Sequence, residues 1–415
     1  MRIWRWVYVG ILLLTLVVGL GVANPLRDMD GKDFRVPQYV VDPFWPKPLP
    51  NDPETGKPWA TGEVAGSCVD SRDHIFTVNR GYNNGLVAPE TVVAVPSPPV
   101  VEYDPQGNVV NAWGEPAILP NGIHGCFIDY QDNVWIAGNG DGIVQKYSHD
   151  GSKLLLQIGT KGVCDWPANN NACGNSGADP NANQSRTFLN QPADVAVDPT
   201  NGDTYIADGY GNHRVVVFDK NGTYLRQWGS VGDGPGQFAA GDGGHPHCIV
   251  LGNDGLVYTC DRGQDRLQVF DKSGKLVKII PVIPGTGTPG IGTAGSAWDV
   301  EFSPDRRQEL MFNADGGNEV LWTFNRLAAL AGAALTATPG QGILAGFGRP
   351  GHNAGEFTFL HTVAADSKGN LYVAETVGGR RIQKFVPRRG KENDLHVFTP
   401  AGNPNQLLPH YDPVK

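Results

Sequence analysis

The chain has 415 residues, among them 55 glycines and 32 prolines, and it carries a net charge of −9. An acidic balance of this size leaves no basic face to neutralise phosphates, which excludes nucleic acid as an expected partner. With 40% hydrophobic residues, the abundance of glycine and proline is typical of many short strands joined by tight turns. Only the stretch "NRLAALAGAAL", residues 325–335, has helical spacing of its apolar residues.

The first 23 residues read as an export signal. Arg2 and Arg5 precede an apolar run over residues 6–23 that ends in small residues. Because this run is nearly long enough to span a bilayer, an uncleaved anchor that attaches the protein to a membrane is the alternative. In both cases the body of the protein is expected outside the cytoplasm, in the periplasm or secreted.

Residues 24–60, which include the stretch "DPFWPKPLP", are expected to form a proline-stiffened lead-in that lies against the remaining domain, residues 61–415. Within that domain an apolar strand, a polar turn and a second apolar strand recur six times. The six copies are "SCVDSRDHIFTVNRG" from Ser67, "GCFIDYQDNVWIAGNG" from Gly125, "DVAVDPTNGDTYIADGYGNHRVVVF" from Asp194, "CIVLGNDGLVYTCDRGQDRLQVF" from Cys248, "DVEFSPDRRQELMFNADGGNEVLWTF" from Asp299 and "TVAADSKGNLYVAETVGGRRIQKF" from Thr362.

The later copies add a third strand, such as "RVVVF" or "RLQVF", and often a fourth, such as "GTYLRQWG". Four strands per copy and six copies predict an all-β fold, a six-bladed β-propeller, because blades packed in a ring bury their faces and leave no long exposed edges. The third and fourth copies, with "ADGYGNHRVVVFD" and "CDRGQDRLQVFDKSG", resemble NHL-repeat propellers in particular. Such rings are often binding platforms, so the fold alone does not predict an enzyme.

One position of the repeat carries histidine in every second copy. It lies five residues before the aspartate, or its substitute, that opens the turn. The six residues at this position are Ala65, His124, Ala193, His247, Trp298 and His361. Because the innermost strands of the blades surround a central channel, His124, His247 and His361 are expected to converge at one depth, about 120° apart. Three neutral imidazoles with an open fourth position are typical of a catalytic zinc site, whereas hydrogen-bonded channel histidines are the alternative.

Residues that end the second strand of each hairpin return to the level of the histidines. Counting from the turns places Asp261 opposite His247 with Arg262 beside it, Tyr210 level with Ala193, and Arg80 level with Ala65. A tyrosine beside arginines at this rim would serve as a base, while a second cation would hold a carboxylate. A packing tyrosine and surface ion pairs are the structural alternatives for these residues.

These motifs, in the order "IHGCFID", "QPADVAVDPTNGDTYIADGYGNHRVVVF", "PHCIVL…CDRGQDRLQVF" and "LHTVAADSKGNLYVAET", resemble the catalytic propeller of the peptidyl-α-hydroxyglycine α-amidating lyases, from about residue 64 to residue 385. The resemblance implies that His124, His247 and His361 bind Zn²⁺. It also implies Tyr210, from "DGYGN", as the base, and Arg80, from "VNRG", with Arg262, from "CDRG", as cations for the substrate. The implied reaction cleaves the C–N bond of a carbinolamide and releases a peptide amide and glyoxylate.

The chain departs from the family pattern at several positions. Members of the family place an aspartate after the third histidine to help hold a structural calcium together with two backbone carbonyls. This chain has Thr362 there, beside the carbonyl positions Ser67 and Cys126, so Ca²⁺ is not expected to be held in the same way. Gly211 replaces a half-cystine after the tyrosine, and Leu360 replaces a methionine. These changes affect the expected substrate more than the expected metal site.

Six cysteines fit an oxidising compartment. Two pairs could close local bridges, Cys164 with Cys173 and Cys248 with Cys260, although spacing alone does not prove a pairing. Cys68 and Cys126 remain, and free buried thiols are the simpler interpretation of these two.

The first hypothesis is therefore an exported, monomeric, zinc-dependent lyase acting on a small-molecule or peptide substrate that carries a carboxylate. A metal-dependent propeller hydrolase of esters or lactones, which would use a metal-bound water, is the second. The third is a non-catalytic NHL-repeat propeller that binds a ligand or another protein. Metal content and glyoxylate release distinguish the three.

Overall fold

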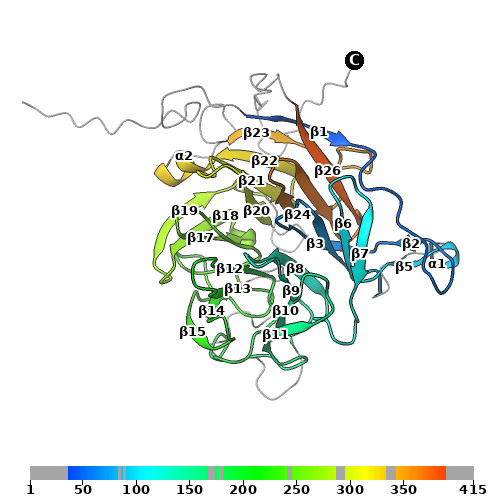
Figure 1. The fold of residues 1–415 in the computed structure, drawn as a ribbon. Helices are drawn as coiled ribbons and strands as arrows, with labels where there is room; N and C mark the ends of the chain where they lie inside the picture. Colours follow the sequence, from blue (N-terminus) through cyan, green and yellow to red (C-terminus); the bar gives the residue numbers. More distant parts are fainter. Residues whose placement is uncertain are drawn as a thin grey trace, which may run out of the picture.

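The computed structural model describes residues 36–82, 86, 90–166, 173–174, 176, 179, 181–240, 245–286, 295–332 and 343–388. The predicted export signal, residues 1–23, lies outside these residues. Six four-stranded antiparallel sheets dominate the chain, and the first strand of each sheet lies beside the first strands of the two neighbouring sheets, which closes a ring (Figure 1). This arrangement confirms the predicted six-bladed β-propeller.

From the inner to the outer strand, each of the first three blades uses one continuous stretch of chain. Blade 1 contains β3 (Val64–Val69), β4 (Ile75–Asn79), β6 (Val100–Tyr103) and β7 (Val109–Trp113); blade 2 contains β8 (Ile123–Ile128), β9 (Val134–Gly138), β10 (Ile143–Tyr147) and β11 (Leu154–Gly159); blade 3 contains β12 (Asp194–Val197), β13 (Thr204–Asp208), β14 (Arg214–Phe218) and β15 (Tyr224–Trp228).

The other three blades follow the same order, but the last one takes its outer strand from the beginning of the chain. Blade 4 contains β16 (Ile249–Leu251), β17 (Leu256–Asp261), β18 (Arg266–Asp271) and β19 (Leu276–Pro281); blade 5 contains β20 (Asp299–Phe302), β21 (Leu310–Asp315), β22 (Val320–Asn325) and β23 (Ile343–Phe347); blade 6 contains β24 (Leu360–Ala365), β25 (Leu371–Glu375), β26 (Arg381–Arg388) and β1 (Gln38–Asp42).

Strand β1 closes the ring. It pairs antiparallel with β26, from Gln38 opposite Arg388 to Asp42 opposite Lys384 (Figure 1). Residues 38–42, which the sequence places in the lead-in, are thus part of the sixth sheet. The following turn also lies against the ring, because the ring of Trp45 packs between Tyr103 of blade 1 and Tyr372 of blade 6. The pairing holds strands from the two ends of the described chain in one sheet, with β1 as the outer edge strand of blade 6.

Small elements complete the described part of the chain. β2 (Trp59–Ala60) and β5 (Val95–Pro96) form a short parallel pair near α1 (Glu90–Val93), at the side of the ring, and the 3₁₀ turn η2 spans Arg262–Gln264. The expected helical stretch forms α2 (Arg326–Ala331). The side chain of Asn325 caps its first turn by accepting the amide of Ala328, and Gly332 ends it in the left-handed region with φ of 99°.

Aspartates at the hairpin turns explain why the inner two strands reverse direction where they do. In blades 1, 2 and 6 the turn aspartate accepts the amides two and four residues later; these aspartates are Asp70, Asp129 and Asp366. A carboxylate that satisfies two amides replaces ladder hydrogen bonds and ends the strand. In these three blades the inner strand therefore ends at an equivalent turn.

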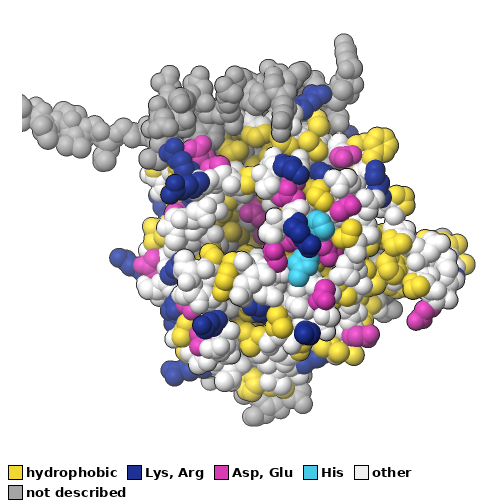
Figure 2. Space-filling view, in the orientation of Figure 1, with side chains coloured by type: hydrophobic (Ala, Val, Ile, Leu, Met, Phe, Trp, Pro, Cys, Tyr) yellow, Lys and Arg dark blue, Asp and Glu magenta, His cyan; other side chains and the backbone are white. Residues whose placement is uncertain are grey.

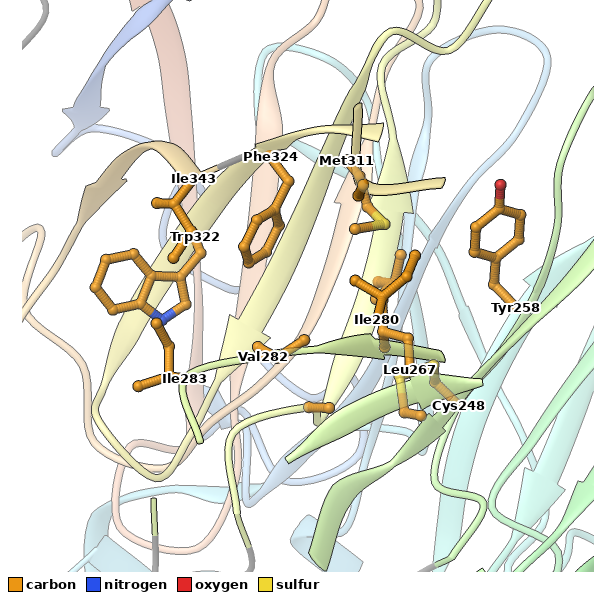
Figure 3. Packing of buried hydrophobic residues seen from close by; sticks show 14 of the residues in the cluster. Cys248, Tyr258, Leu267, Ile280, Val282, Ile283, Met311, Trp322, Phe324 and Ile343 are labelled. Carbon is orange, nitrogen blue, oxygen red and sulfur yellow. A yellow bond between two sulfur atoms is a disulfide. The ribbon is translucent and has the colours of Figure 1, made fainter. Parts of the chain in front are cut away.

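The core lies between neighbouring blades. Between blades 4 and 5, for example, Leu267 and Ile280 face Met311, Trp322 and Phe324 (Figure 3). Both faces of each sheet are covered in this way, which is why strands such as β9 and β13 are buried along their whole length.

Three disulfides join the six cysteines. Two are the local pairs that the sequence suggests, Cys164–Cys173 and Cys248–Cys260. The third pairs Cys68 with Cys126, so the interpretation of these two as free thiols is wrong. They lie on β3 and β8, which are neighbouring inner strands of different blades, and the bond therefore ties blade 1 to blade 2.

The double substitution Cys68→Ala/Cys126→Ala is expected to lower the free energy of unfolding more than Cys164→Ala/Cys173→Ala. The first bridge closes a loop of sequence separation 58 and the second one of 9. In the chain-entropy treatment these loops correspond to about 4 and about 2–3 kcal/mol. Urea denaturation of both variants measures the difference, and an equal or smaller loss for the first pair would contradict it.

The surface carries charges of both signs without a broad basic patch on the face shown in Figure 2. In the same view, histidine side chains lie beside basic and acidic ones. Among the described residues, none of the helices has the length and apolar character needed to cross a bilayer.

Candidate metal centre

The three predicted histidines lie together at the centre of the ring. His124 is on β8, His247 is just before β16 and His361 is on β24, so they come from blades 2, 4 and 6. Their ring centroids are 4.8 Å (His124 to His247), 4.6 Å (His124 to His361) and 5.0 Å (His247 to His361) apart. Each is buried, and one nitrogen of each lies within 4.8 Å of the others. The repeat position thus brings the triad to one point, as the sequence predicts.

Backbone carbonyls of the intervening blades orient the rings. His124 Nδ1 lies 2.8 Å from the carbonyl oxygen of Ala193, His247 Nδ1 2.6 Å from that of Trp298, and His361 Nδ1 2.7 Å from that of Ala65. These three acceptors occupy the same repeat position in blades 3, 5 and 1. A carbonyl only accepts, so each Nδ1 carries the hydrogen and each Nε2 keeps a lone pair.

The electrostatic environment keeps these imidazoles neutral. Burial lowers the pKa of His124 and of His247 well below the usual range. Neighbouring histidines and the charge of Arg262 lower both further, and the charge of Arg80 also lowers that of His124. Burial also lowers the pKa of His361 to about 3, helped by the same arginines. Neutral imidazoles with free Nε2 lone pairs are the form that binds a metal ion.

The hydroxyl of Tyr210 lies where the imidazoles converge. Its oxygen is 3.0 Å from His124 Nε2 and 3.1 Å from His247 Nε2. One hydroxyl proton can satisfy only one of these two acceptors. An arrangement with more lone pairs than protons favours a cation at this point, and the three nitrogen donors with an oxygen nearby match the ligand set of a catalytic zinc ion.

Arg262 and Trp298 border the triad. Arg262, buried at the end of β17, places its guanidinium carbon 4.2 Å from the ring centroid of Trp298 and 5.9 Å from that of Tyr210. The Trp298 indole N–H donates to the carbonyl of Gly295 at 2.6 Å, and its ring lies 5.9 Å from that of His247. Trp298 is a site residue that the sequence analysis did not predict. The sequence shows it only as the residue that the fifth copy has at the histidine position of the repeat.

Arg80 lies at the same rim, and its guanidinium group donates three hydrogen bonds to other residues of the protein. Its Nε donates to the carbonyl of Ile123, its Nη1 to Glu63 and its Nη2 to the side chain of Asn139. The bond to Ile123 lies next to His124. In this arrangement Arg80 supports the strand that bears His124, and a role as a substrate cation stays a prediction.

The register predicted across the inner hairpin is correct in blade 4 and wrong in blades 1 and 3. The amide of His247 donates to the carbonyl of Cys260, which places Asp261 opposite His247. Tyr210 instead pairs through its amide with the carbonyl of Gln191, and Arg80 with that of Glu63. Both lie beyond the strand ends, so they are not level with Ala193 and Ala65, although the hydroxyl of Tyr210 still reaches the triad.

Comparisons with known proteins agree with the repeat and with the resemblance. The family model described as "NHL repeat" matches residues 189–218. NHL repeat-containing protein 3 of Homo sapiens is 26% identical over 358 residues, which cover 84% of each chain. The chain is also 26% identical to peptidyl-glycine alpha-amidating monooxygenase B of Xenopus laevis over 80% of its own length, and spans 35% of that protein. A probable peptidyl-alpha-hydroxyglycine alpha-amidating lyase of Caenorhabditis elegans is 24% identical over 62% of this chain and 68% of that protein.

The chain is thus a six-bladed β-propeller that carries an NHL repeat and is similar in sequence to proteins named as amidating lyases. A solved streptogramin B lyase is also similar, at 10% identity and a TM-score of 0.47 over 84% of this chain and 98% of that one.

Below the triad, the channel of this NHL-repeat propeller opens into a cavity of about 310 Å³. Ser67 and Thr362 line it, and their hydroxyl oxygens lie 3.2 Å apart. Cys126, whose carbonyl is the second one that the resemblance implies for Ca²⁺, forms a disulfide with Cys68. Thr362 therefore brings a hydroxyl, and no charge, to the place where the resemblance implies a calcium ligand.

Three acidic side chains line the same cavity: Asp194, Asp299 and Glu301. Burial raises the pKa of Glu301 to about 7. Folded Glu301 thus keeps its proton up to about pH 7, whereas the unfolded residue loses it near 4.5. The contribution of Glu301 to stability is consequently lost as the pH rises between these two values, and it does not return above pH 7.

Substituting Glu301→Gln is therefore expected to have little effect on stability near pH 4.5 and to increase it by about 1–3 kcal/mol near pH 8. Urea denaturation of both proteins at the two pH values measures this. A difference in stability that does not vary with pH would show that Glu301 does not titrate in this way.

Proposed function

We propose that this propeller is a zinc-dependent lyase that cleaves the C–N bond of a hydroxyglycine-like carbinolamide. The observation that carries the proposal is the convergence of three neutral imidazoles, each with its Nδ1 hydrogen held by a carbonyl, at a point where the hydroxyl of Tyr210 contacts two of them. Relatives named as amidating lyases support the reaction class. His124, His247 and His361 would hold the Zn²⁺.

Zinc bound there would supply Lewis acidity toward a hydroxyl oxygen of the substrate. The protein's own residues account for the proton and for binding. In its phenolate form, with its own proton released to solvent beforehand, Tyr210 Oη would accept the hydroxyl proton while the electron pair of the C–N bond leaves with the nitrogen. Delivery of the same proton to that nitrogen yields the amide and glyoxylate, so no water is consumed.

Arg262 is placed to bind the carboxylate of such a substrate. Its guanidinium group is buried, and it lies over the Trp298 ring and near that of Tyr210. Water therefore screens its attraction for an anion less than that of a surface arginine. Substituting Arg262→Gln is expected to raise the KM for a substrate with a free carboxylate about 10- to 100-fold, since hydrogen bonds to charged groups contribute about 1.5–3 kcal/mol.

Steady-state kinetics with a carboxylate substrate and with its methyl ester check this role of Arg262. The substitution should affect the ester much less than the acid. Equal changes in KM for both would contradict a carboxylate-binding role.

Incubation of the purified protein with a model N-acyl-α-hydroxyglycine tests the proposed reaction. Release of glyoxylate above the uncatalysed rate, abolished by a chelator and restored by Zn²⁺, is the expected result. Hydrolysis of esters or lactones without glyoxylate would favour a metal-dependent hydrolase instead. Absence of turnover together with absence of stoichiometric zinc would favour a binding propeller, a function compatible with relatives that are named only for their repeats.

We further propose that the protein works outside the cytoplasm and that its N-terminal segment, if it is not cleaved, attaches it to the membrane. Three disulfides are compatible with an extracellular location. The proposed substrate is a small molecule or peptide with a carboxylate.

A further inference from the structure

A second group of metal-binding side chains lies at the turn face of blade 1. Asp70 and His74 belong to the hairpin turn between β3 and β4, and Glu102 is on β6. One ligand atom of each lies within 4.8 Å of the others, and His74 Nδ1 is 2.6 Å from Glu102 Oε1. Ala65, at the level of the channel triad, is five residues from Asp70 along the inner strand, which corresponds to about 16 Å. The group is therefore separate from the metal centre described above.

Comparison of blade 1 with blade 2 shows what is unusual about this group. Glu102 pairs with Phe76 in blade 1, and Lys146 occupies the same position in blade 2, where it pairs with Trp135. Lys146 Nζ lies 2.9 Å from the turn aspartate Asp129. Blade 2 thus has an ion pair where blade 1 brings two carboxylates together, an arrangement that repels itself unless a cation is present.

Two further side chains face the carboxylates. His149, from the turn between β10 and β11 of blade 2, places Nε2 2.9 Å from Asp70 Oδ2. Arg72 Nη2 lies 3.1 Å from Asp70 Oδ2 and 3.5 Å from Glu102 Oε1. The side chains of Asp70 and Glu102 are buried, whereas that of Arg72 is 56% exposed. Arg72 also donates through Nε to Asp70 Oδ2 at 3.2 Å, so a metal ion would have to take the place of this arginine. Because an exposed ion pair contributes little to stability, the arginine can turn into solvent when the ion binds.

We propose that Asp70, His74 and Glu102, joined by His149, form a second site for a divalent transition metal ion of the zinc class. Two carboxylates with two imidazoles suit zinc and its neighbours, whereas calcium and magnesium prefer oxygen ligands alone. A metal ion here neutralises the two carboxylates and bridges blades 1 and 2. The same two blades are joined by the Cys68–Cys126 disulfide and by hydrogen bonds from Ser71 to Asp132.

Zinc binding to the full-length, chelator-stripped protein tests this site. After equilibrium dialysis against micromolar free Zn²⁺, the variants His74→Ala and Glu102→Lys are expected to bind one equivalent less than the wild type. Glu102→Lys is the sharper variant, because it gives blade 1 the lysine that blade 2 already carries at this position and should preserve the fold. In a His247→Ala background, Glu102→Lys is expected to remove the remaining equivalent, which separates this site from the channel triad.

Two further variants control for nonspecific effects. His352→Ala removes an exposed histidine outside the group and should leave zinc binding unchanged. Arg72→Ala should tighten binding at the second site about two- to fivefold, since the arginine competes with the metal at the strength of an exposed ion pair. Zinc content in Glu102→Lys equal to that of the wild type, or weaker binding in Arg72→Ala, would overturn the proposal whether or not the channel triad binds zinc.

Discussion

The His247→Ala variant is expected to lose the channel zinc and, with it, nearly all release of glyoxylate. His247 supplies one of the three converging Nε2 atoms, and its Nδ1 is already fixed by the Trp298 carbonyl. Changes to residues that only orient metal ligands reduce metal affinity about 10- to 100-fold, so loss of a ligand itself should cost more than that. Metal analysis after dialysis, together with a glyoxylate assay, measures both effects.

The exposed His352 provides the matched control for this experiment, because His352→Ala removes an imidazole without touching the channel. Circular dichroism of both variants verifies that the propeller still forms. Full zinc content and full activity in folded His247→Ala would remove the triad from the mechanism.

The Tyr210→Phe variant is expected to keep the channel zinc and to lose turnover by about 10²- to 10⁴-fold, the usual contribution of a positioned general acid or base. The phenylalanine retains the ring and removes only the hydroxyl that lies 3.0 and 3.1 Å from His124 and His247. Zinc content and kcat, measured on the same preparation, separate loss of the proton acceptor from loss of the metal.

Tyr224→Phe is a suitable comparison, since Tyr224 lies on the outer strand β15, away from the triad. It should be as active as the wild type. Undiminished kcat in Tyr210→Phe, or a parallel loss of zinc, would contradict the role of Tyr210 in proton transfer.

The sequence predicts the histidine triad well because its signal is periodic. His124, His247 and His361 occupy one repeat position, and a propeller places equal repeat positions around one axis. The same reasoning explains a feature that was not predicted: Ala65, Ala193 and Trp298, at that position in the other blades, contribute the carbonyls that orient the imidazoles. Every residue has a backbone carbonyl, so the sequence does not reveal which carbonyls accept these hydrogen bonds.

Residues beyond the regular strands are harder to place. Counting across a hairpin gives the right partner for His247 because β16 and β17 pair without a bulge up to the turn. In blade 1 the register shifts between Val64 and Gly66. In blade 3 the β12–β13 ladder is regular, but its turn sets a register that places Tyr210 opposite Gln191 and not Ala193. Neither the bulge nor the register set by the turn follows from residue spacing, and for this reason the levels assigned to Arg80 and Tyr210 are wrong.

The repeat pattern also does not predict contacts between segments that are far apart in the sequence. β1 is a single strand with no second copy beside it in the sequence, so the repeat does not identify it as the outer strand of blade 6. Cys68 and Cys126 are 58 residues apart and meet only because β3 and β8 are adjacent inner strands. Both features depend on closure of the ring, which local patterns do not encode.

Anomalous diffraction from crystals of the protein, recorded at the zinc absorption edge, tests the central claim most directly. A peak on the propeller axis is expected, about 2.0–2.1 Å from the Nε2 atoms of His124, His247 and His361. Crystals grown with zinc that show no anomalous peak among these three imidazoles would contradict it.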